Sequence, residues 1–212
     1  MFNIVKRTLD IILSLIAIII LSPFFIIISL LIIIDTPGPI FADIPPRVGK
    51  GYKPFKMYKF RSMIKDAHRL LKEDPRFRDL YREYKNNNYK LKNDPRITRV
   101  GKILRSTSLD EIPQFFNVCI GNMSLVGPRA YYFDELDFYR KSKMKLTKRD
   151  VNIVTSVKPG ITGIWQISGR SSIPFDKRIQ LDLEYVRTQS LSGDLKILLK
   201  TPGAVLSKKG AY

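Results

Sequence analysis

The sequence is poor in cysteine, histidine and acidic residues, and each shortage narrows the class of protein. A single cysteine, Cys119, excludes an internal disulfide framework and is typical of a reducing compartment. A single histidine, His68, has no second histidine with which to share a metal, and we expect it on the exposed face of a charged helix. The 19 acidic residues are outnumbered by 37 lysines and arginines, and the net charge of +18 indicates an anionic partner.

Motifs that would identify this partner as nucleic acid or a free nucleotide are also missing. There is no zinc-finger spacing, no RNP-like aromatic strand and no basic region with heptads, so we predict no nucleic-acid partner. There is neither a G-x-x-x-x-G-K-[ST] loop nor a G-x-G-x-x-G loop, so a conventional nucleotide-binding fold is not indicated. Phospholipid headgroups and a phosphorylated substrate remain. The length of 212 residues suits one domain with a core of its own.

One long apolar run, Ile11 to Ile34, spans about 24 residues, more than the roughly 20 that cross a bilayer. It is too long for the apolar region of a signal peptide, which has about 7–15 residues. Ser22-Pro23 falls at its midpoint, where proline removes one backbone hydrogen bond and obstructs another. Basic residues on both sides draw both flanks toward the cytoplasm. The residues themselves leave two interpretations open: a kinked spanning helix, or a helix broken at Ser22-Pro23 that returns to the face it entered.

The rest of the chain predicts mainly helices with short extended segments. A turning connection is expected over 35–53 and a short strand over 54–63, where apolar and basic residues alternate. Helices are expected over 64–93, 110–118, 132–152, 174–189 and 193–199, and glycine-containing loops over 121–129 and 158–172. Apolar residues from Leu195 to Leu206 are interspersed with Lys196, Lys200, Lys208 and Lys209. This amphipathic pattern suits the bilayer interface and packing on the core equally.

Basic residues recur beside glycines in several loops. The clusters are Arg47 and Lys50 with Gly49 and Gly51, Lys59 with Arg61, Arg129 after Gly127-Pro128, and Arg170 after Gly169. Guanidinium groups bind phosphate oxygens in pairs, and glycine lets backbone N–H groups approach a phosphate closely. Any one cluster is more often a solvated surface. Their recurrence makes phosphate binding an equal alternative.

The stretch "RSTSLDEIPQ" places Asp110 and Glu111 side by side in this basic chain. Ser108 and Glu111 have the S-x-x-E spacing of a helix capping box. Pro113 lies one residue too deep for a helix capped by Ser108, which favours a helix start near Asp110. In both cases the carboxylates lie at the positive end of a helix dipole. The stretch alone slightly favours capping and leaves a catalytic pair of carboxylates open.

Five segments together resemble one known family. They are "YKFRSM", "DPRITRVGKILRSTSLDEIPQFFNV", "GNMSLVGPR", "KPGITGIWQISGR" and "DLKILLKT", and the resemblance covers nearly the whole chain. The sequence resembles the bacterial sugar transferases, the monotopic polyprenyl-phosphate phosphoglycosyl transferases that begin glycan assembly. The fold that this resemblance implies is mainly α with short β elements. A re-entrant membrane helix over 1–36, broken at Ser22-Pro23, is expected before a small cytoplasmic α/β catalytic domain over 37–212 with interfacial amphipathic helices.

The resemblance also implies an activity. It implies transfer of a sugar-1-phosphate from a UDP-sugar to undecaprenyl phosphate, with release of UMP and with Mg²⁺ as cofactor. The expected place is the bacterial inner (cytoplasmic) membrane, with the catalytic domain on its cytoplasmic face among anionic lipids. The expected role is the first membrane step of surface glycan synthesis, for exopolysaccharide, capsule, O-antigen or glycoprotein glycan. The alternative from another class is a non-enzymatic, membrane-anchored basic module that binds anionic lipid or a partner enzyme.

By the same resemblance, Asp110 is the nucleophile that carries the phosphosugar, and Glu111 organises the metal or a proton. Both are the expected Mg²⁺ ligands. The expected phosphate or uridine contacts are Lys59, Arg61, Arg105, Arg129 and Arg170. The family often reads Pro-Arg-Pro where this chain has Pro128-Arg129-Ala130, which loosens that loop. The sequence assigns no chemistry to the charged insert between Met63 and Asp94, it does not indicate which sugar is transferred, and it leaves a homo-oligomer open.

Overall fold

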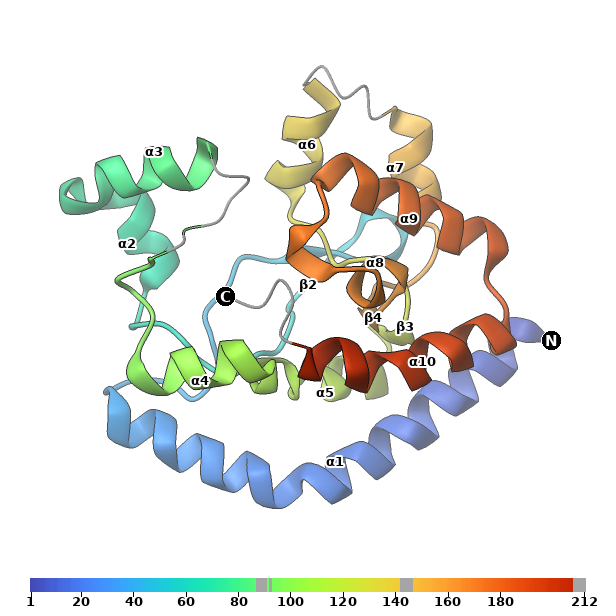
Figure 1. Ribbon diagram of the computed structural model, residues 1–212, viewed down its shortest axis with the longest axis horizontal. Coiled ribbons are helices and arrows are strands. Elements are labelled where there is room, and N and C mark those ends of the chain that lie inside the picture. Colours follow the sequence, from blue (N-terminus) through green and yellow to red (C-terminus); the bar gives the residue numbers. More distant parts are fainter. Residues whose placement is uncertain (87–90, 92, 142–146, 208–212) are drawn as a thin grey trace.

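The apolar run lies in one continuous helix, α1 (Phe2–Asp35), in the computed structural model, which describes residues 1–86, 91, 93–141 and 147–207. Figure 1 shows α1 as a bent helix with the rest of the protein on its concave side. Pro23 lacks the N–H that would bond to the carbonyl of Ile19, and the Ser22 hydroxyl donates to that same carbonyl at 2.8 Å. The helix is therefore bent and not interrupted at Ser22-Pro23, because the Ser22 hydroxyl satisfies the carbonyl that Pro23 leaves unpaired, and the re-entrant path stays a prediction.

The outer face of α1 is apolar and exposed. Within α1 only Asp10, Ser14, Ile28 and Ile32 are buried, whereas isoleucine, leucine and phenylalanine side chains along its length are exposed. Within the described residues α1 is the one helix long and apolar enough to cross a membrane, judged by length and composition. So large an apolar surface needs a cover of lipid or protein.

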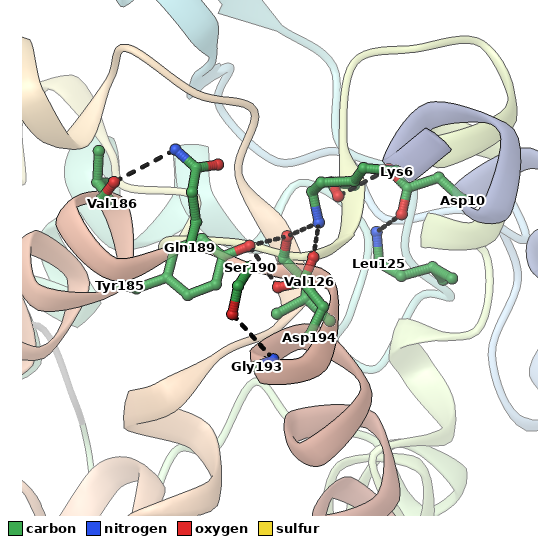
Figure 2. Close-up of polar contacts among 11 residues, drawn as sticks. Lys6, Asp10, Leu125, Val126, Tyr185, Val186, Gln189, Ser190, Gly193 and Asp194 are labelled. Atoms are coloured by element: carbon green, nitrogen blue, oxygen red, sulfur yellow. Dashed lines mark hydrogen bonds and ion pairs between the residues drawn. The ribbon is translucent and has the colours of Figure 1, made fainter. Parts of the chain in front are cut away.

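A charged contact attaches the N-terminal end of α1 to two later elements, β3 (Ser124–Val126) and α10 (Leu191–Leu206). Lys6 donates to the Asp194 carboxylate at 2.5 Å and to the carbonyl of Val126 at 3.0 Å. The hydroxyl of Tyr185, from α9 (Phe175–Thr188), donates to the other Asp194 oxygen at 2.8 Å (Figure 2). The start of α1 is therefore fixed against the body of the protein.

Asp10 and Arg7 extend this attachment by one turn. The Asp10 carboxylate accepts from the Ser124 hydroxyl at 2.7 Å and from the Leu125 N–H at 3.0 Å. Arg7 donates to the carbonyls of Val118 and Cys119, at the end of α5 (Gln114–Cys119). A carboxylate at the edge of an apolar run would be costly in lipid, and these contacts satisfy it.

The remaining elements are short. Two strands pair antiparallel, β1 (Arg47–Val48) with β2 (Pro54–Phe55), and two pair in parallel, β3 with β4 (Gly160–Thr162). The other α-helices are α2 (Ala67–Glu73), α3 (Arg78–Asn86), α4 (Arg99–Thr107), α6 (Phe133–Lys141), α7 (Lys148–Val154) and α8 (Ile164–Ile167). Single 3₁₀ turns cover η1 (Lys50–Tyr52), η2 (Pro75–Phe77), η3 (Leu109–Glu111) and η4 (Arg170–Ser172).

Three apolar clusters hold these elements together. The first lies between α6, α7 and α9, and the second packs α5, β3, α9 and α10 around Val118 and Met123. The third joins the C-terminal half of α1 to α4 through Ile28, Ile32 and Leu104. In Figure 1, α4, α5 and α10 lie in a row along the concave side of α1. One face of α1 thus packs against α4, α5 and β3.

The mainly helical fold with short strands and one long apolar helix agrees with the sequence prediction. The two glycine loops, however, each contain a strand. They pair because Gly127 and Gly160 bring two backbones together: a Cβ on Gly160 would lie 2.1 Å from the Gly127 nitrogen. The last helix, α10, continues through Pro202 to Leu206, well past the predicted end at residue 199. Lys208 and Lys209 lie outside the described residues.

Candidate active site

Asp110 and Glu111 lie in the turn η3 between α4 and α5. Helix α4 ends at Ser108, which adopts a left-handed conformation with φ 59°, and α5 begins only at Gln114, after Pro113. Ser108 makes no capping hydrogen bond; its hydroxyl instead accepts from Arg170 at 2.5 Å. The capping interpretation and the predicted helix start near Asp110 are therefore wrong. The proline keeps these residues in a turn, which leaves both carboxylates free of helix capping.

Lys59 joins the two carboxylates. Its ammonium lies 2.5 Å from the Glu111 carboxylate and 3.7 Å from that of Asp110. The next residue, Phe60, donates its N–H to the carbonyl of Asp110 at 2.9 Å, which fixes the two segments side by side. Asp110 is 9% exposed, whereas the side chain of Glu111 is 38% exposed. The pair therefore consists of one buried carboxylate and one that reaches solvent.

The surroundings move the two acidic pKa values in opposite directions. Burial raises the pKa of Asp110, and the Glu111 charge adds to this, while Lys59 opposes it. Removal from water alone would raise the pKa of Glu111, but Lys59, Arg170 and Arg129 outweigh it and lower that pKa. Burial would lower the pKa of Lys59, yet the two carboxylates outweigh it and raise that pKa, so Lys59 stays charged. Divergent pKa values in one pair are typical of acid–base and nucleophilic sites.

These groups lie in the wall of a cavity of about 820 Å³. The cavity brings together all of the site residues predicted outside α1, namely Lys59, Arg61, Arg105, Asp110, Glu111, Arg129 and Arg170. Its volume suits a substrate of nucleotide-sugar size. The two residues of the predicted membrane break, Ser22 and Pro23, are not part of the cavity wall.

One side of the cavity presents hydrogen-bond donors without partners. The Arg129 guanidinium lies 5.2 Å from the centre of the Trp165 ring, on α8. The Nε of Arg129, the Nε1 of Trp165 and one terminal nitrogen of Arg170 are buried and have no hydrogen-bond partner among the described residues. Buried donors without acceptors are costly, so this side is built to receive an anion. Trp165, the only tryptophan of the sequence, was missed, although its place in a glycine-rich loop was a usable signal.

Arg61 has a structural role that the sequence did not predict. Its guanidinium donates to three carbonyls at the C-terminal end of α1, those of Ile32, Thr36 and Pro37, at 3.3, 2.6 and 3.0 Å. A cation at this end also complements the negative end of the helix dipole. Its terminal nitrogens are engaged with these carbonyls, while its Nε has no hydrogen-bond partner among the described residues and its side chain lines the cavity, so the phosphate contact stays a prediction.

His68 and Arg47 line the cavity as well. The prediction of an exposed His68 is wrong: it is half-buried, and burial, with Arg96 and Arg47 nearby, lowers its pKa to about 4. Arg47 is buried, donates to the carbonyl of Ala130 at 3.0 Å and lies 3.3 Å from the centre of the Tyr132 ring. The glycines next to Arg47 indicated a binding role for that residue. No feature of the sequence around His68 indicated that it lines the cavity.

Asp110 and Glu111 are also the groups that could bind Mg²⁺ in this cavity. Among the described residues no group of three or more histidine, cysteine, aspartate or glutamate side chains could hold a metal. Mg²⁺ in phosphoryl-transfer sites is commonly held by one or two carboxylates together with the substrate's phosphates. Asp110 and Glu111, beside the unpartnered donors, meet this requirement. They fit a metal that arrives with a phosphorylated substrate.

The long apolar helix is consistent with a membrane anchor, and the cavity of paired carboxylates and unpartnered donors suits phosphoryl chemistry. The family model of the bacterial sugar transferases matches residues 1–208. The chain belongs to the bacterial sugar transferase family.

Relatives within this family have names that describe their activities. The chain is 44% identical over 207 residues to the undecaprenyl-phosphate galactose phosphotransferase of Salmonella typhimurium, which covers 98% of this chain and 41% of that protein. It is 36% identical over 215 residues to the UDP-glucose:undecaprenyl-phosphate glucose-1-phosphate transferase of Escherichia coli, covering 99% and 42%. The exopolysaccharide production protein ExoY of Rhizobium meliloti is 38% identical over 208 residues, covering 98% and 88%. The chain thus spans about two fifths of the length of the first two relatives and most of the third.

Proposed function

We propose that the protein transfers a sugar-1-phosphate from a UDP-sugar to undecaprenyl phosphate and releases UMP, as a step in surface glycan synthesis. The observation that carries this proposal is the buried Asp110 beside Glu111 and Lys59, in a cavity where buried donors of Arg129, Trp165 and Arg170 lack acceptors. The names of the relatives support the two substrate classes. A basic module without activity would not need a buried carboxylate next to a second one.

In the first half-reaction, a carboxylate oxygen of Asp110 attacks the sugar-bearing phosphorus of the UDP-sugar. A bond forms between that oxygen and the phosphorus, and the bond from phosphorus to the bridging oxygen breaks. UMP leaves with the electron pair of the broken bond. The phosphosugar stays on Asp110 as an acyl phosphate, so one difficult displacement becomes two easier ones.

In the second half-reaction, a phosphate oxygen of undecaprenyl phosphate attacks the same phosphorus. The bond from phosphorus to Asp110 breaks and the carboxylate is regenerated. Arg129, Trp165 and Arg170 supply the donors for the phosphate oxygens in both steps, since each presents a buried donor without a partner among the described residues. Arg105 also lines the cavity and adds positive charge near Asp110.

Mg²⁺, when bound with the substrate phosphates, would offset the negative charge that the diphosphate and two carboxylates bring together. Asp110 and Glu111 are the residues that would hold it. Lys59 favours the ionised form of both carboxylates, because its charge opposes the effect of burial on their pKa values. Glu111, whose lowered pKa keeps it anionic, is the better metal ligand, and Asp110, whose raised pKa makes it the more basic carboxylate, is the nucleophile.

The proposed location is the bacterial inner membrane, with the catalytic domain (37–212) on its cytoplasmic face and α1 re-entrant. Both ends of α1 are attached to the same body, through Lys6 and Asp10 at its start and through Arg61 at its end. A helix attached at both ends favours a path that enters and leaves by one face. Exposed apolar side chains on α4, α5 and α10, including Ile103, Phe116 and Leu199, suit the adjoining lipid interface. Anionic lipids there suit the net charge of +18.

The topology predicts a labelling pattern. Cysteines introduced next to Met1 and beyond Asp35 should both resist a membrane-impermeant thiol reagent in intact cells and react after the cells are opened. A Pro23→Ala variant should shift α1 toward spanning, because it restores the backbone hydrogen bond and removes the steric cause of the bend. Labelling of the Met1 position from outside in the unchanged protein would show that α1 spans.

The activity itself is tested with the full chain, Mg²⁺, undecaprenyl phosphate and a panel of UDP-sugars. UMP release that depends on the lipid acceptor, with at least one sugar of the panel, is the expected result. If no UDP-sugar yields UMP while the protein still binds vesicles of anionic lipid, the non-enzymatic basic module becomes the better account.

A further inference from the structure

The charged insert of residues 64–96 is closed at its base. The backbones of Met63 and Ile97 form an antiparallel bridge, and the N–H of Ile64 donates to the carbonyl of Arg96 at 2.8 Å. The Arg96 guanidinium binds the Asp94 carboxylate at 2.6 and 2.8 Å and the carbonyl of Ala67, at the start of α2, at 2.9 Å. The Arg96 side chain is only 2% exposed. The insert is therefore anchored at its base, and α2 has a fixed position.

This position makes the insert one wall of the cavity. His68 on α2 and Tyr84 on α3 line it, together with the buried Arg47 and its ring partner Tyr132. Arg47 is 8% exposed, and its Nε has no hydrogen-bond partner among the described residues. Arg47 also influences the pKa values of both His68 and Tyr84, which places these groups near one another. We name this part of the cavity, with Asp43, the insert lobe.

The insert lobe differs chemically from the side that holds Arg129, Trp165 and Arg170. The unpartnered atoms of these three side chains are all donors, which suits phosphate oxygens, because these only accept. The insert lobe combines the carboxylate of Asp43, the tyrosine hydroxyls and a neutral imidazole. These groups accept as well as donate. Sugar hydroxyls also do both, and the aromatic rings suit the apolar C–H faces of a pyranose.

We infer that the insert lobe binds the sugar of the UDP-sugar donor and determines which sugar is accepted. The inference rests on the proposed function, since it divides the same cavity between the diphosphate and the sugar. The diphosphate lies in the middle of a UDP-sugar, between the uridine and the sugar. With the diphosphate at Arg129, Trp165 and Arg170, the uridine and the sugar extend from it in different directions. The insert lobe receives the sugar end, and the charged insert thereby gains a role in specificity. Sites that hydrogen-bond a hydroxyl discriminate strongly against analogues in which that bond is lost.

The test compares two ligands that differ by the phosphosugar. Affinities for UMP and for each UDP-sugar are measured with Mg²⁺ by calorimetry in an Asp110→Asn background, which binds but cannot form the adduct. Tyr84→Phe and His68→Ala are then added singly. Tyr81→Phe is the matched control, because Tyr81 lies on the same helix but is not part of the cavity wall. Retained UMP binding shows that each variant is folded.

Tyr84→Phe or His68→Ala should weaken binding of the preferred UDP-sugar about tenfold and change the ratio of affinities for UDP-glucose and UDP-galactose. UMP affinity should stay within about twofold, and Tyr81→Phe should change neither affinity. An equal loss of UMP affinity would assign the lobe to uridine and overturn the inference, as would unchanged UDP-sugar binding in both variants. A further outcome is that the unsubstituted enzyme releases no UMP although these binding differences are observed. In that case the proposed function fails, whereas sugar binding by the insert lobe is supported.

Discussion

Replacement of Asp110 by asparagine is expected to lower lipid-dependent UMP release by roughly a thousandfold or more. The amide has nearly the shape of the carboxylate but cannot form the acyl phosphate that carries the phosphosugar. Asp110 lies in the cavity wall, 9% exposed, with Lys59 at 3.7 Å. Turnover is measured with the purified variant in lipid vesicles. Asp79→Asn is a suitable control, because the Asp79 side chain is 95% exposed on α3, and it should keep full activity.

The stability of the Asp110→Asn variant distinguishes a catalytic role of Asp110 from a helix-capping role. The folded-state pKa of Asp110 is raised, so its contribution to stability is present below its unfolded pKa and is lost as pH rises through the folded pKa. At pH 7 the ionised carboxylate is therefore a cost, and Asp110→Asn should unfold at the same or a higher denaturant concentration. A helix cap would instead lose about 1 kcal/mol. Reduced stability together with substantial residual activity would remove Asp110 from the nucleophile role.

Replacement of Lys59 by methionine is expected to lower turnover about a hundredfold at pH 7. Lys59 provides the positive charge closest to both carboxylates, and its charge lowers the pKa values of Asp110 and Glu111. Without it, two adjacent carboxyl groups compete for one proton, and the raised pKa of Asp110 rises further. Since only the ionised carboxylate attacks phosphorus, the variant should recover part of its activity as pH is raised.

Lys59→Arg is the matched control, because it keeps the charge, and its pH profile should stay close to that of the unchanged enzyme. The measurement is the pH dependence of kcat for all three proteins. A loss in Lys59→Met that is the same at every pH would contradict a role in ionisation and would indicate that Lys59 contacts the substrate directly.

The local sequence predicts some parts of this site well. Asp110 and Glu111 stand out because acids are scarce in a basic chain, and Arg129 and Arg170 because they follow glycines. The same reasoning did not reveal that Arg61 binds the end of a helix, since the carbonyls it contacts lie 24 to 29 residues away in the chain. A basic residue in an apolar segment can bind a phosphate or end a helix. Only the fold distinguishes the two.

The positions of residues that depend on contacts with distant segments could not be predicted from the local sequence. β3 and β4 have three residues each, and the parallel pairing of Ser124 with Gly160 joins segments that are far apart in the chain. Too few residues alternate in either segment to indicate a strand. His68 lies in the cavity because Arg96 anchors α2 from the far end of the insert. Long helices such as α9, with a repeating apolar pattern, were predicted to within a few residues.

The covalent intermediate on Asp110 is the central feature of the proposed mechanism. Its most direct test is to mix the enzyme with Mg²⁺ and the preferred UDP-sugar without lipid acceptor, then measure the released UMP and the mass of the intact protein. We expect a burst of one UMP per active site, a mass increase of one sugar phosphate that hydroxylamine removes, and neither in Asp110→Asn. UMP release only after undecaprenyl phosphate is added, with no change in protein mass, would contradict the account and favour direct transfer between the two substrates.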